Sequence, residues 1–195
     1  YAHQTPQQIF RAFRIFRGHM FFTICFAAII PATPDLFDRR MQYSMAMHDT
    51  LPWQDIETVF LDMDGTLLDL HFDNHFWLEY MPRRYAEHHG QSLEWAKAEV
   101  YPLMRAKQGQ LEWYCLDYWT RELGLPIVEL KREIAHLISL RPDADTFLQA
   151  LQRSGRQVVL ITNAHRDSLS LKMERVELRT WFQRLISSHD YGYPK

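Results

Sequence analysis

Two aspartates one residue apart follow an apolar run in the segment VFLDMDGTLLDL, residues 59–70. Residues 56–64 have the β-branched and aromatic composition of a buried strand. Alternate residues of a strand share a face, so the carboxylates of Asp62 and Asp64 can approach a single point. Two close carboxylates repel each other, and Mg²⁺, a hard cation that prefers oxygen ligands, would neutralise them. We therefore expect a site for Mg²⁺ and phosphate at the end of this strand.

The segment after this strand predicts a block of helices. Residues 76–89, 92–107 and 111–123 each carry apolar side chains at three- and four-residue spacings. Glycines follow or interrupt these runs where helices would end. We expect an all-helical insert over residues 72–141.

Beyond the insert, strands and helices alternate again. Residues 143–155 and 166–178 predict helices, and residues 157–163 and about 185–188 predict buried strands. Strands that alternate with helices are typical of an α/β fold with a parallel sheet and right-handed crossovers. The predicted α/β core therefore comprises residues 53–71 and 142–195, and its ligands should bind at the carboxyl ends of the strands.

Three segments resemble, in order, the motifs of the haloacid dehalogenase superfamily of phosphohydrolases. DMDGTLLD (62–69) is similar to the first motif, LITNAH (160–165) to the second and GYPK (192–195) to the third. Together with FDNHFW (72–77) and WYCLDYW (113–119), these segments also resemble the bacterial GMP/IMP nucleotidase branch, which hydrolyses purine nucleoside monophosphates. The resemblance implies a Rossmann-like core, a helical cap over the site, and a phosphomonoester as substrate.

The resemblance also implies a role for each carboxylate. Asp62 would be the nucleophile that forms an aspartyl-phosphate, and Asp64 would be the general acid and then the general base. Mg²⁺ would be held by the Asp62 carboxylate and by the backbone carbonyl of Asp64. Lys195 would neutralise charge on the nucleophile and on the phosphoryl oxygens.

Four further residues are implied to bind the phosphate group. Gly65 has no Cβ, so its backbone can approach the phosphate closely, and Thr66 shares the same turn. Thr162, by its hydroxyl, and Asn163, by its backbone or amide, would hold the phosphoryl oxygens. The fourth motif of the superfamily, an acidic pair that completes the Mg²⁺ site, is expected beyond Lys195. We therefore expect a C-terminally truncated sequence whose own activity is in doubt.

Alternatives stay open for the substrate and for several side chains. The same chemistry suits a phosphatase or phosphomutase acting on sugar phosphates, and a truncated fold suits a non-catalytic, membrane-tethered binding protein. Phe72, Asn74 and Trp77 are expected where the cap meets the core. The aromatic residues of the cap either offer faces for a purine or pack in its interior; they are Trp113, Tyr114, Tyr118 and Trp119. His71 and His75 are four residues apart, so they could be metal ligands on one face of a helix or could have a capping or surface role.

Net charge and cysteine spacing bear on the class of protein and on its cellular compartment. The net charge of −2 argues against a nucleic-acid-binding protein, which would carry a clustered basic surface. Cys25 and Cys115 have no zinc-ligand spacing, which argues against a disulfide framework or structural zinc and favours the reducing cytoplasm. Residues 1–52 are expected to be an extension and linker, and their basic and apolar stretch at 9–30 resembles a targeting segment. Its apolar run at 20–30 is shorter than the roughly 20 residues that span a bilayer, so we do not expect it to form a transmembrane helix.

Overall fold

The computed structural model describes residues 53–195. The predicted extension over residues 1–52, with its candidate targeting segment, lies outside the described residues. Within residues 53–195, no helix is both long enough and apolar enough to cross a membrane.

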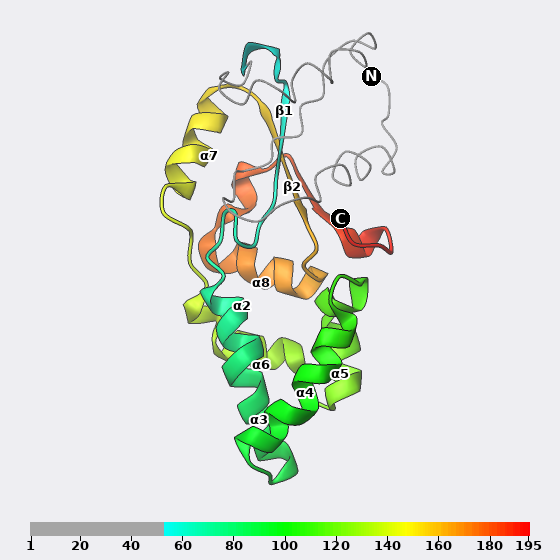
Figure 1. Ribbon diagram of the computed structural model, residues 1–195. Helices are drawn as coiled ribbons and strands as arrows, with labels where there is room; N and C mark the ends of the chain where they lie inside the picture. Colours follow the sequence, from blue (N-terminus) through cyan, green and yellow to red (C-terminus); the bar gives the residue numbers. More distant parts are fainter. Residues whose placement is uncertain (1–52) are drawn as a thin grey trace, which may run out of the picture.

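A parallel sheet carries the predicted motifs (Figure 1). Its strands are β1 (Thr58–Leu61), β2 (Gln157–Thr162) and β3 (Arg184–Ser187), in the order β1-β2-β3. Val59 of β1 pairs with Val158, and Leu160 of β2 pairs with Leu185. The prediction of an α/β fold with a parallel, Rossmann-like sheet is confirmed.

The first strand is shorter than the nine residues predicted for it, 56–64. It ends at Leu61 because the chain turns at once: the carbonyl of Met63 accepts hydrogen bonds from the amides of Leu67 and Leu68, both at 2.9 Å. The two aspartates therefore lie in the loop after the strand, not within it.

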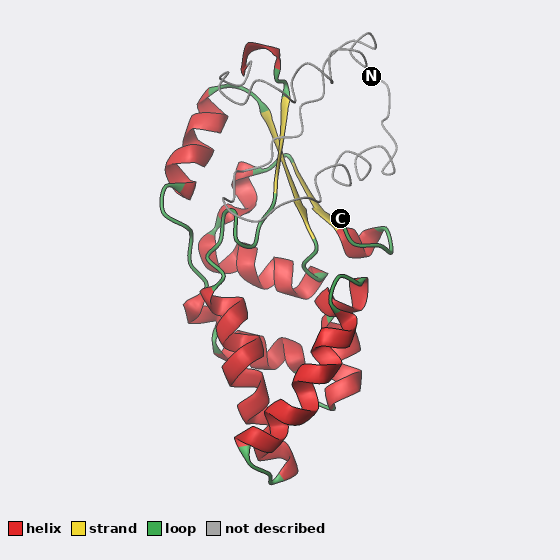
Figure 2. Cartoon of the chain, viewed as in Figure 1, coloured by secondary structure: helices red, strands yellow, loops and turns green. Residues whose placement is uncertain are grey.

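Helices form a second layer beside the sheet and a separate block below it (Figures 1 and 2). The α-helices of the block are α2 (His71–His75), α3 (Met81–His89), α4 (Leu93–Lys107), α5 (Leu116–Leu123) and α6 (Ile127–Glu133). Those beside the sheet are α7 (Ala144–Arg153) and α8 (Arg166–Val176). A π-helical turn, η3 (Phe76–Tyr80), joins α2 to α3. Shorter 3₁₀ turns are η2 (Trp53–Asp55), η4 (Leu111–Tyr114), η5 (Ala135–Leu137), η6 (Leu178–Trp181) and η7 (Ser188–Asp190).

The strands are buried on both faces, as expected for a parallel sheet. One face contributes to the main core together with α7 and α8; its strand residues are Val59, Leu61, Val158 and Leu160. The same core continues into the helical block through Phe72, Phe76 and Trp119. The other face forms a smaller cluster of Phe60, Val159, Ile161 and Ile186. One continuous core therefore holds the block against the sheet layer.

Two adjacent linkers join the block to the sheet layer. Leu68 and Leu140 form an antiparallel bridge, the Asp69 amide donates to the Ser139 carbonyl at 3.0 Å, and the Arg141 amide donates to the Leu67 carbonyl at 2.9 Å. The linkers lie close to the predicted ends of the insert, residues 72 and 141, and the division into two domains there stays a prediction.

The single helix predicted over residues 111–123 is wrong in its first half. Residues 111–114 form η4, Cys115 is extended at φ −84° and ψ 110°, and α5 begins at Leu116. The Trp119 indole nitrogen donates to the Trp113 carbonyl at 3.0 Å, and the Cys115 sulfur accepts from the Tyr118 amide at 3.4 Å. Side chains thus replace the backbone hydrogen bonds that a continuous helix would make here, which apolar spacing does not reveal.

Candidate active site

Three of the predicted site residues meet at the carboxyl ends of β1 and β2. Asp62 follows β1, and its Oδ1 accepts from the Met63 amide at 2.7 Å and forms an ion pair with the Lys195 ammonium. Lys195 also donates from its backbone amide to Asn163 Oδ1 at 2.8 Å and from Nζ to the Ile161 carbonyl at 3.0 Å. The lysine predicted to neutralise Asp62 is therefore in contact with it.

Thr162 and Asn163 lie where β2 ends. Thr162 is buried, and its hydroxyl oxygen accepts from the Ala164 amide at 3.0 Å, which leaves the hydroxyl hydrogen to be donated elsewhere. The Asn163 amide oxygen positions the backbone of Lys195. Asn163 therefore orders the lysine, a contact that its predicted role in phosphate binding did not include.

Gly65 and Thr66 form the tight turn after Asp64. Gly65 has φ +75°, its amide donates to the Leu68 carbonyl at 2.9 Å, and its carbonyl accepts from Arg141 Nη1 at 3.2 Å. A Cβ at this position would lie 3.4 Å from the Leu70 side chain. Glycine is therefore favoured here by the backbone conformation itself. Its contact with phosphate stays a prediction.

The carboxylate of Asp64 belongs to a network that was not predicted. Lys172 of α8 donates from Nζ to Asp64 Oδ1 and to Asp73 Oδ2, both at 2.6 Å. Lys131 of α6 donates to the other oxygen of Asp73 at 2.9 Å. Both lysine side chains are only 2% exposed. Two carboxyl groups and two ammonium groups thus meet at the boundary between the sheet layer and the helical block.

Burial and the neighbouring charges set the pKa values in this network. Burial raises the pKa of Asp64, and Lys172 opposes that shift only in part. Burial also raises the pKa of Asp73, but Lys131 and Lys172 together lower it well below its usual range. Burial lowers the pKa of Lys172, and the two carboxylates overcome this effect, so its pKa is raised and it stays protonated. Burial lowers the pKa of Lys131, a shift that Asp73 opposes in part.

A signal for both lysines was present in the sequence. Lys172 lies among the buried residues Ser168, Leu169 and Met173 of α8, and Lys131 lies between the buried Leu130 and Ile134. Each lysine therefore occupies the apolar stripe of its helix, where an unpaired ammonium would be costly. A lysine at such a position predicts a buried carboxylate partner, although it does not identify which one.

A cavity of about 260 Å³ opens between the helical block and Asp64. Asp64 and Lys172 line it on the side of the sheet layer, and Asn74, Trp77 and Tyr114 line it on the side of the block, as does Trp113. Asp62 is not among the lining residues. Of the two aspartates after β1, only Asp64 therefore borders this cavity.

The remaining aromatic candidates, Tyr118 and Trp119, are not among the residues that line this cavity. Trp119 is 1% exposed, and Tyr118 packs below the Lys107 ammonium, 5.1 Å from its ring centroid. Of the two roles considered for the aromatic residues of the cap, Trp119 has the second: it packs in the interior. His75 pairs with Glu79 at 3.3 Å, and no cluster of three or more metal-ligand side chains among residues 53–195 includes His71 or His75.

The oxygen donors at the end of β1 fit a hard cation. Both donors that approach the Asp62 carboxylate contact Oδ1, so Oδ2 is the atom that it would offer to Mg²⁺. The Asp64 carboxylate is engaged by Lys172 and would contribute its backbone carbonyl instead. One carboxylate oxygen and one carbonyl oxygen suit Mg²⁺, which keeps several water ligands.

Comparison with known proteins identifies the family of this chain. Residues 56–195 match the haloacid dehalogenase-like hydrolase family. The chain is 44% identical over 149 residues to the GMP/IMP nucleotidase YrfG of Escherichia coli K12, covering 76% of this chain and 67% of that protein. The GMP/IMP nucleotidase of Shigella flexneri matches to the same extent. The chain thus spans about two thirds of the length of these relatives.

A solved structure supports the fold. The crystal structure of a HAD phosphatase from Thermococcus onnurineus aligns with a TM-score of 0.60 at 20% identity, covering 68% of this chain and 62% of that one. The family predicted from the three motifs is confirmed: this chain belongs to the haloacid dehalogenase-like hydrolases.

Proposed function

We propose that this protein hydrolyses phosphomonoesters through an aspartyl-phosphate on Asp62, and that its substrates are purine 5′-mononucleotides. The observation that carries the chemistry is the contact between the Asp62 carboxylate and the Lys195 ammonium at the ends of parallel strands. The substrate class rests on the 44% identity to GMP/IMP nucleotidases. The aromatic residues Trp77, Trp113 and Tyr114 around the cavity supply flat apolar faces suited to a base.

In the first step, an Asp62 oxygen attacks phosphorus in line with the ester oxygen. The bond between phosphorus and the ester oxygen breaks, and its electron pair stays on that oxygen, which takes a proton from Asp64. The raised pKa of Asp64, caused by burial, favours the protonated form that this step requires. Asp64 also lines the cavity, on the side from which a nucleoside leaving group would depart.

In the second step, Asp64 accepts a proton from water, and the water oxygen attacks phosphorus. The bond to Asp62 breaks, phosphate is released, and the carboxylate is restored. Lys195 and the Thr162 hydroxyl would stabilise the negative charge on the phosphoryl oxygens in both steps. Mg²⁺, held by the Asp62 carboxylate and the Asp64 carbonyl, would supply further charge stabilisation.

The test compares Asp62→Asn with Asp145→Asn, a matched change at an exposed position of α7. Phosphate release from IMP, GMP and a panel of sugar phosphates is measured with Mg²⁺ present. Asp62→Asn should abolish turnover while the thermal unfolding transition is kept, and Asp145→Asn should leave both unchanged. Asp64→Asn should slow turnover by about 10²–10⁴-fold, the usual contribution of an acid–base group.

Two results would contradict the proposal separately. Turnover retained by Asp62→Asn would remove Asp62 as the nucleophile. If sugar phosphates were hydrolysed well and IMP and GMP poorly, the chemistry would stand and the assignment to purine nucleotides would fail.

A further inference from the structure

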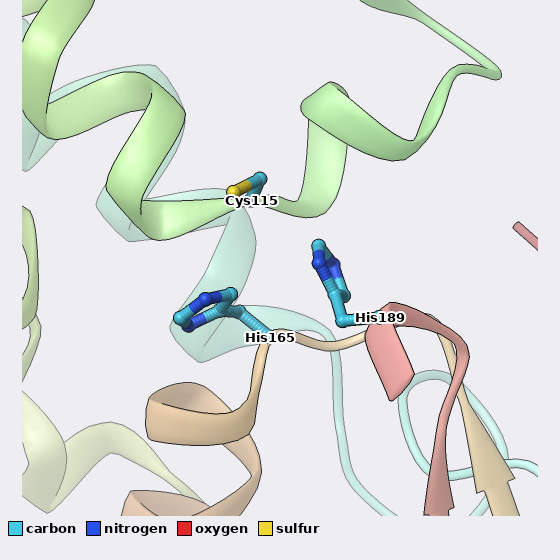
Figure 3. Close-up of side chains that lie close together, drawn as sticks. All are labelled: Cys115, His165 and His189. Atoms are coloured by element: carbon cyan, nitrogen blue, oxygen red, sulfur yellow. The ribbon is translucent and has the colours of Figure 1, made fainter. Parts of the chain in front are cut away.

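Three side chains of types that can ligate a metal meet where the helical block faces the sheet layer (Figure 3). Cys115 comes from the break between η4 and α5, His165 precedes α8, and His189 lies in η7 after β3. A ligand atom from each, the cysteine sulfur and one nitrogen of each histidine, lies within 4.8 Å of the other two. The two imidazole rings are 5.0 Å apart and nearly perpendicular, at 82°.

His189 offers an unpaired ring nitrogen to this cluster. Its ring makes one hydrogen bond, with the backbone of Asn163. Its Nε2 is buried and has no hydrogen-bond partner among the described residues. The bond with Asn163 therefore uses Nδ1, and Nε2 keeps its lone pair. Metal-binding histidines commonly donate one nitrogen to a backbone carbonyl and coordinate through the other.

His165 connects this cluster to two carboxylates. Its Nδ1 accepts from the Asp167 amide at 3.5 Å, and its Nε2 lies 3.6 Å from Asp117 Oδ2. Asp117, His165 and Asp167 also place ligand atoms within 4.8 Å of one another. Asp117 lies in the first turn of the helix that Cys115 caps, so the carboxylate beside His165 comes from the helical block.

We propose that Cys115, His165 and His189 form a second metal site, which binds Zn²⁺ or a similar thiophilic divalent cation. A thiolate with two neutral imidazoles is a donor set that Zn²⁺ favours, whereas Mg²⁺ prefers oxygen ligands. The site is separate from the oxygen donors of Asp62 and Asp64 and does not rest on the proposed function.

The position of the site gives metal binding a structural consequence. One ligand belongs to the helical block and two belong to the sheet layer, where His165 is part of the cavity wall. A bound cation would tie the two parts together beside the cavity. The linear sequence hides this arrangement because the three ligands are far apart along the chain and lack the short spacings of zinc motifs.

The test uses two variants that remove a ligand and keep a helix cap. Cys115 caps α5 through its sulfur, and serine is a good N-cap but a poor zinc ligand, so Cys115→Ser isolates coordination from folding. His165 is the N-cap of α8, and His165→Asn likewise keeps a capping side chain. His189→Gln removes the third ligand. Cys25→Ser and His88→Ala serve as matched controls.

Titration of the full chain with Co²⁺ alone should produce a thiolate-to-cobalt charge-transfer band at one equivalent. Addition of Zn²⁺ should then displace Co²⁺ and abolish the band, whereas addition of Mg²⁺ should not. Cys115→Ser should lose this band. His165→Asn and His189→Gln should each weaken Zn²⁺ binding by about tenfold or more. Zn²⁺ should raise the melting temperature of the wild-type chain and of both controls, with no such shift in Cys115→Ser.

Three outcomes would overturn the proposal. They are the absence of a thiolate band in the wild-type chain, an unchanged band in Cys115→Ser, and loss of the band in Cys25→Ser. None of these readouts depends on phosphate release, so they are distinguishable from a failure of the proposed hydrolase mechanism.

Discussion

Lys172 contacts two carboxylates of this site, those of Asp64 and Asp73. It donates to Asp64 and Asp73 while its side chain is almost fully buried, so both pairs lie largely out of water. Removing one partner of a buried ion pair leaves the other charge uncompensated, which costs far more than losing a surface salt bridge. Lys172 is therefore as much a structural residue as a positioning residue for Asp64.

Lys172→Met should lower the free energy of unfolding by about 3–5 kcal/mol, the cost of an uncompensated buried charge. Lys97→Met, a change of the same type in α4, should lower it by less than about 1 kcal/mol. Urea unfolding of both variants measures the difference. Equal effects of the two changes would show that the Lys172 contacts contribute little to stability.

Asp73 should make stability depend on pH in a defined direction. Its folded-state pKa lies below its usual value of 3.8, because Lys131 and Lys172 outweigh the effect of burial. A carboxyl group whose pKa is lowered by folding stabilises the protein above its unfolded pKa and loses that contribution as pH falls towards the folded pKa.

We therefore expect Asp73→Asn to be less stable than wild type by a constant amount at neutral pH. The difference in unfolding free energy should shrink as the pH falls below about 4, where Asp73 of the unfolded wild-type chain becomes protonated. Urea unfolding at a series of pH values between neutral and acidic gives the two curves. A difference that widens in acid would have the wrong sign for this account.

At the scale of elements, the turn after β1 places the two aspartates of the site directly beyond the end of a buried strand. Gly65 adopts φ +75°, and the Met63 carbonyl accepts hydrogen bonds from the amides of Leu67 and Leu68. Because the chain turns so tightly, both aspartates lie within three residues of the strand end. A Cβ at Gly65 would add a 3.4 Å contact with Leu70 to the strain of the left-handed conformation.

Gly65→Ala should lower the free energy of unfolding by about 1 kcal/mol or more, and it should also reduce phosphate release because the strained turn carries Asp64. Gly155→Ala is the matched control, since Gly155 has φ +70° and a Cβ added there would meet nothing within 4 Å. It should lose similar stability with turnover unchanged. Thermal unfolding and phosphate release of both variants separate the two effects, and equal turnover in the two would contradict a role for this turn.

The break at Cys115 is the second element that matters for the site. A continuous helix over residues 111–123 would keep Trp113 and Tyr114 on a regular helical surface, whereas η4 ends at Tyr114 and both residues line the cavity. The same break brings the Cys115 sulfur close to His165 and His189. One local departure from helical geometry thus shapes both the cavity and the proposed zinc site.

At the scale of the whole molecule, the cavity exists only because the helical block faces the sheet layer across it. Residues of the block supply its aromatic wall, and Asp64 and Lys172 supply its charged end. Recognition of the leaving group and chemistry at phosphorus should therefore be separable by mutation.

Tyr114→Leu should raise the KM for IMP and GMP by about tenfold, roughly one stacking contact, with a smaller change in kcat. Trp95→Leu, which alters an aromatic residue of the block that stacks on Tyr85, should leave KM unchanged. Steady-state kinetics with both nucleotides measures the effect. A fall in kcat alone for Tyr114→Leu would place this side chain in the chemical step and not in base binding.

The predictions from sequence succeeded where the determining interactions are local or where a motif carries them. Local apolar patterns were enough to predict where β2 and α7 begin and end, and DMDGT marks the turn after β1. Asp62, Asn163 and Lys195 were predicted together because the motifs resemble those of a family, and the structure brings them together at one edge of the sheet. The length of β1 and the break at Cys115 were missed because specific hydrogen bonds decide them.

What the sequence alone determined was the family, the parallel α/β core and the pair of aspartates after its first strand. Tertiary structure decided which charge pairs with the second aspartate: Lys172 reaches Asp64 across 108 positions of sequence, and no local pattern encodes so distant a pair. It also decided that Cys115, His165 and His189 share one point. The physical reason is the same in both cases. Packing of an apolar core brings distant helices together, and the few polar side chains carried into that core must then pair with one another or with a ligand.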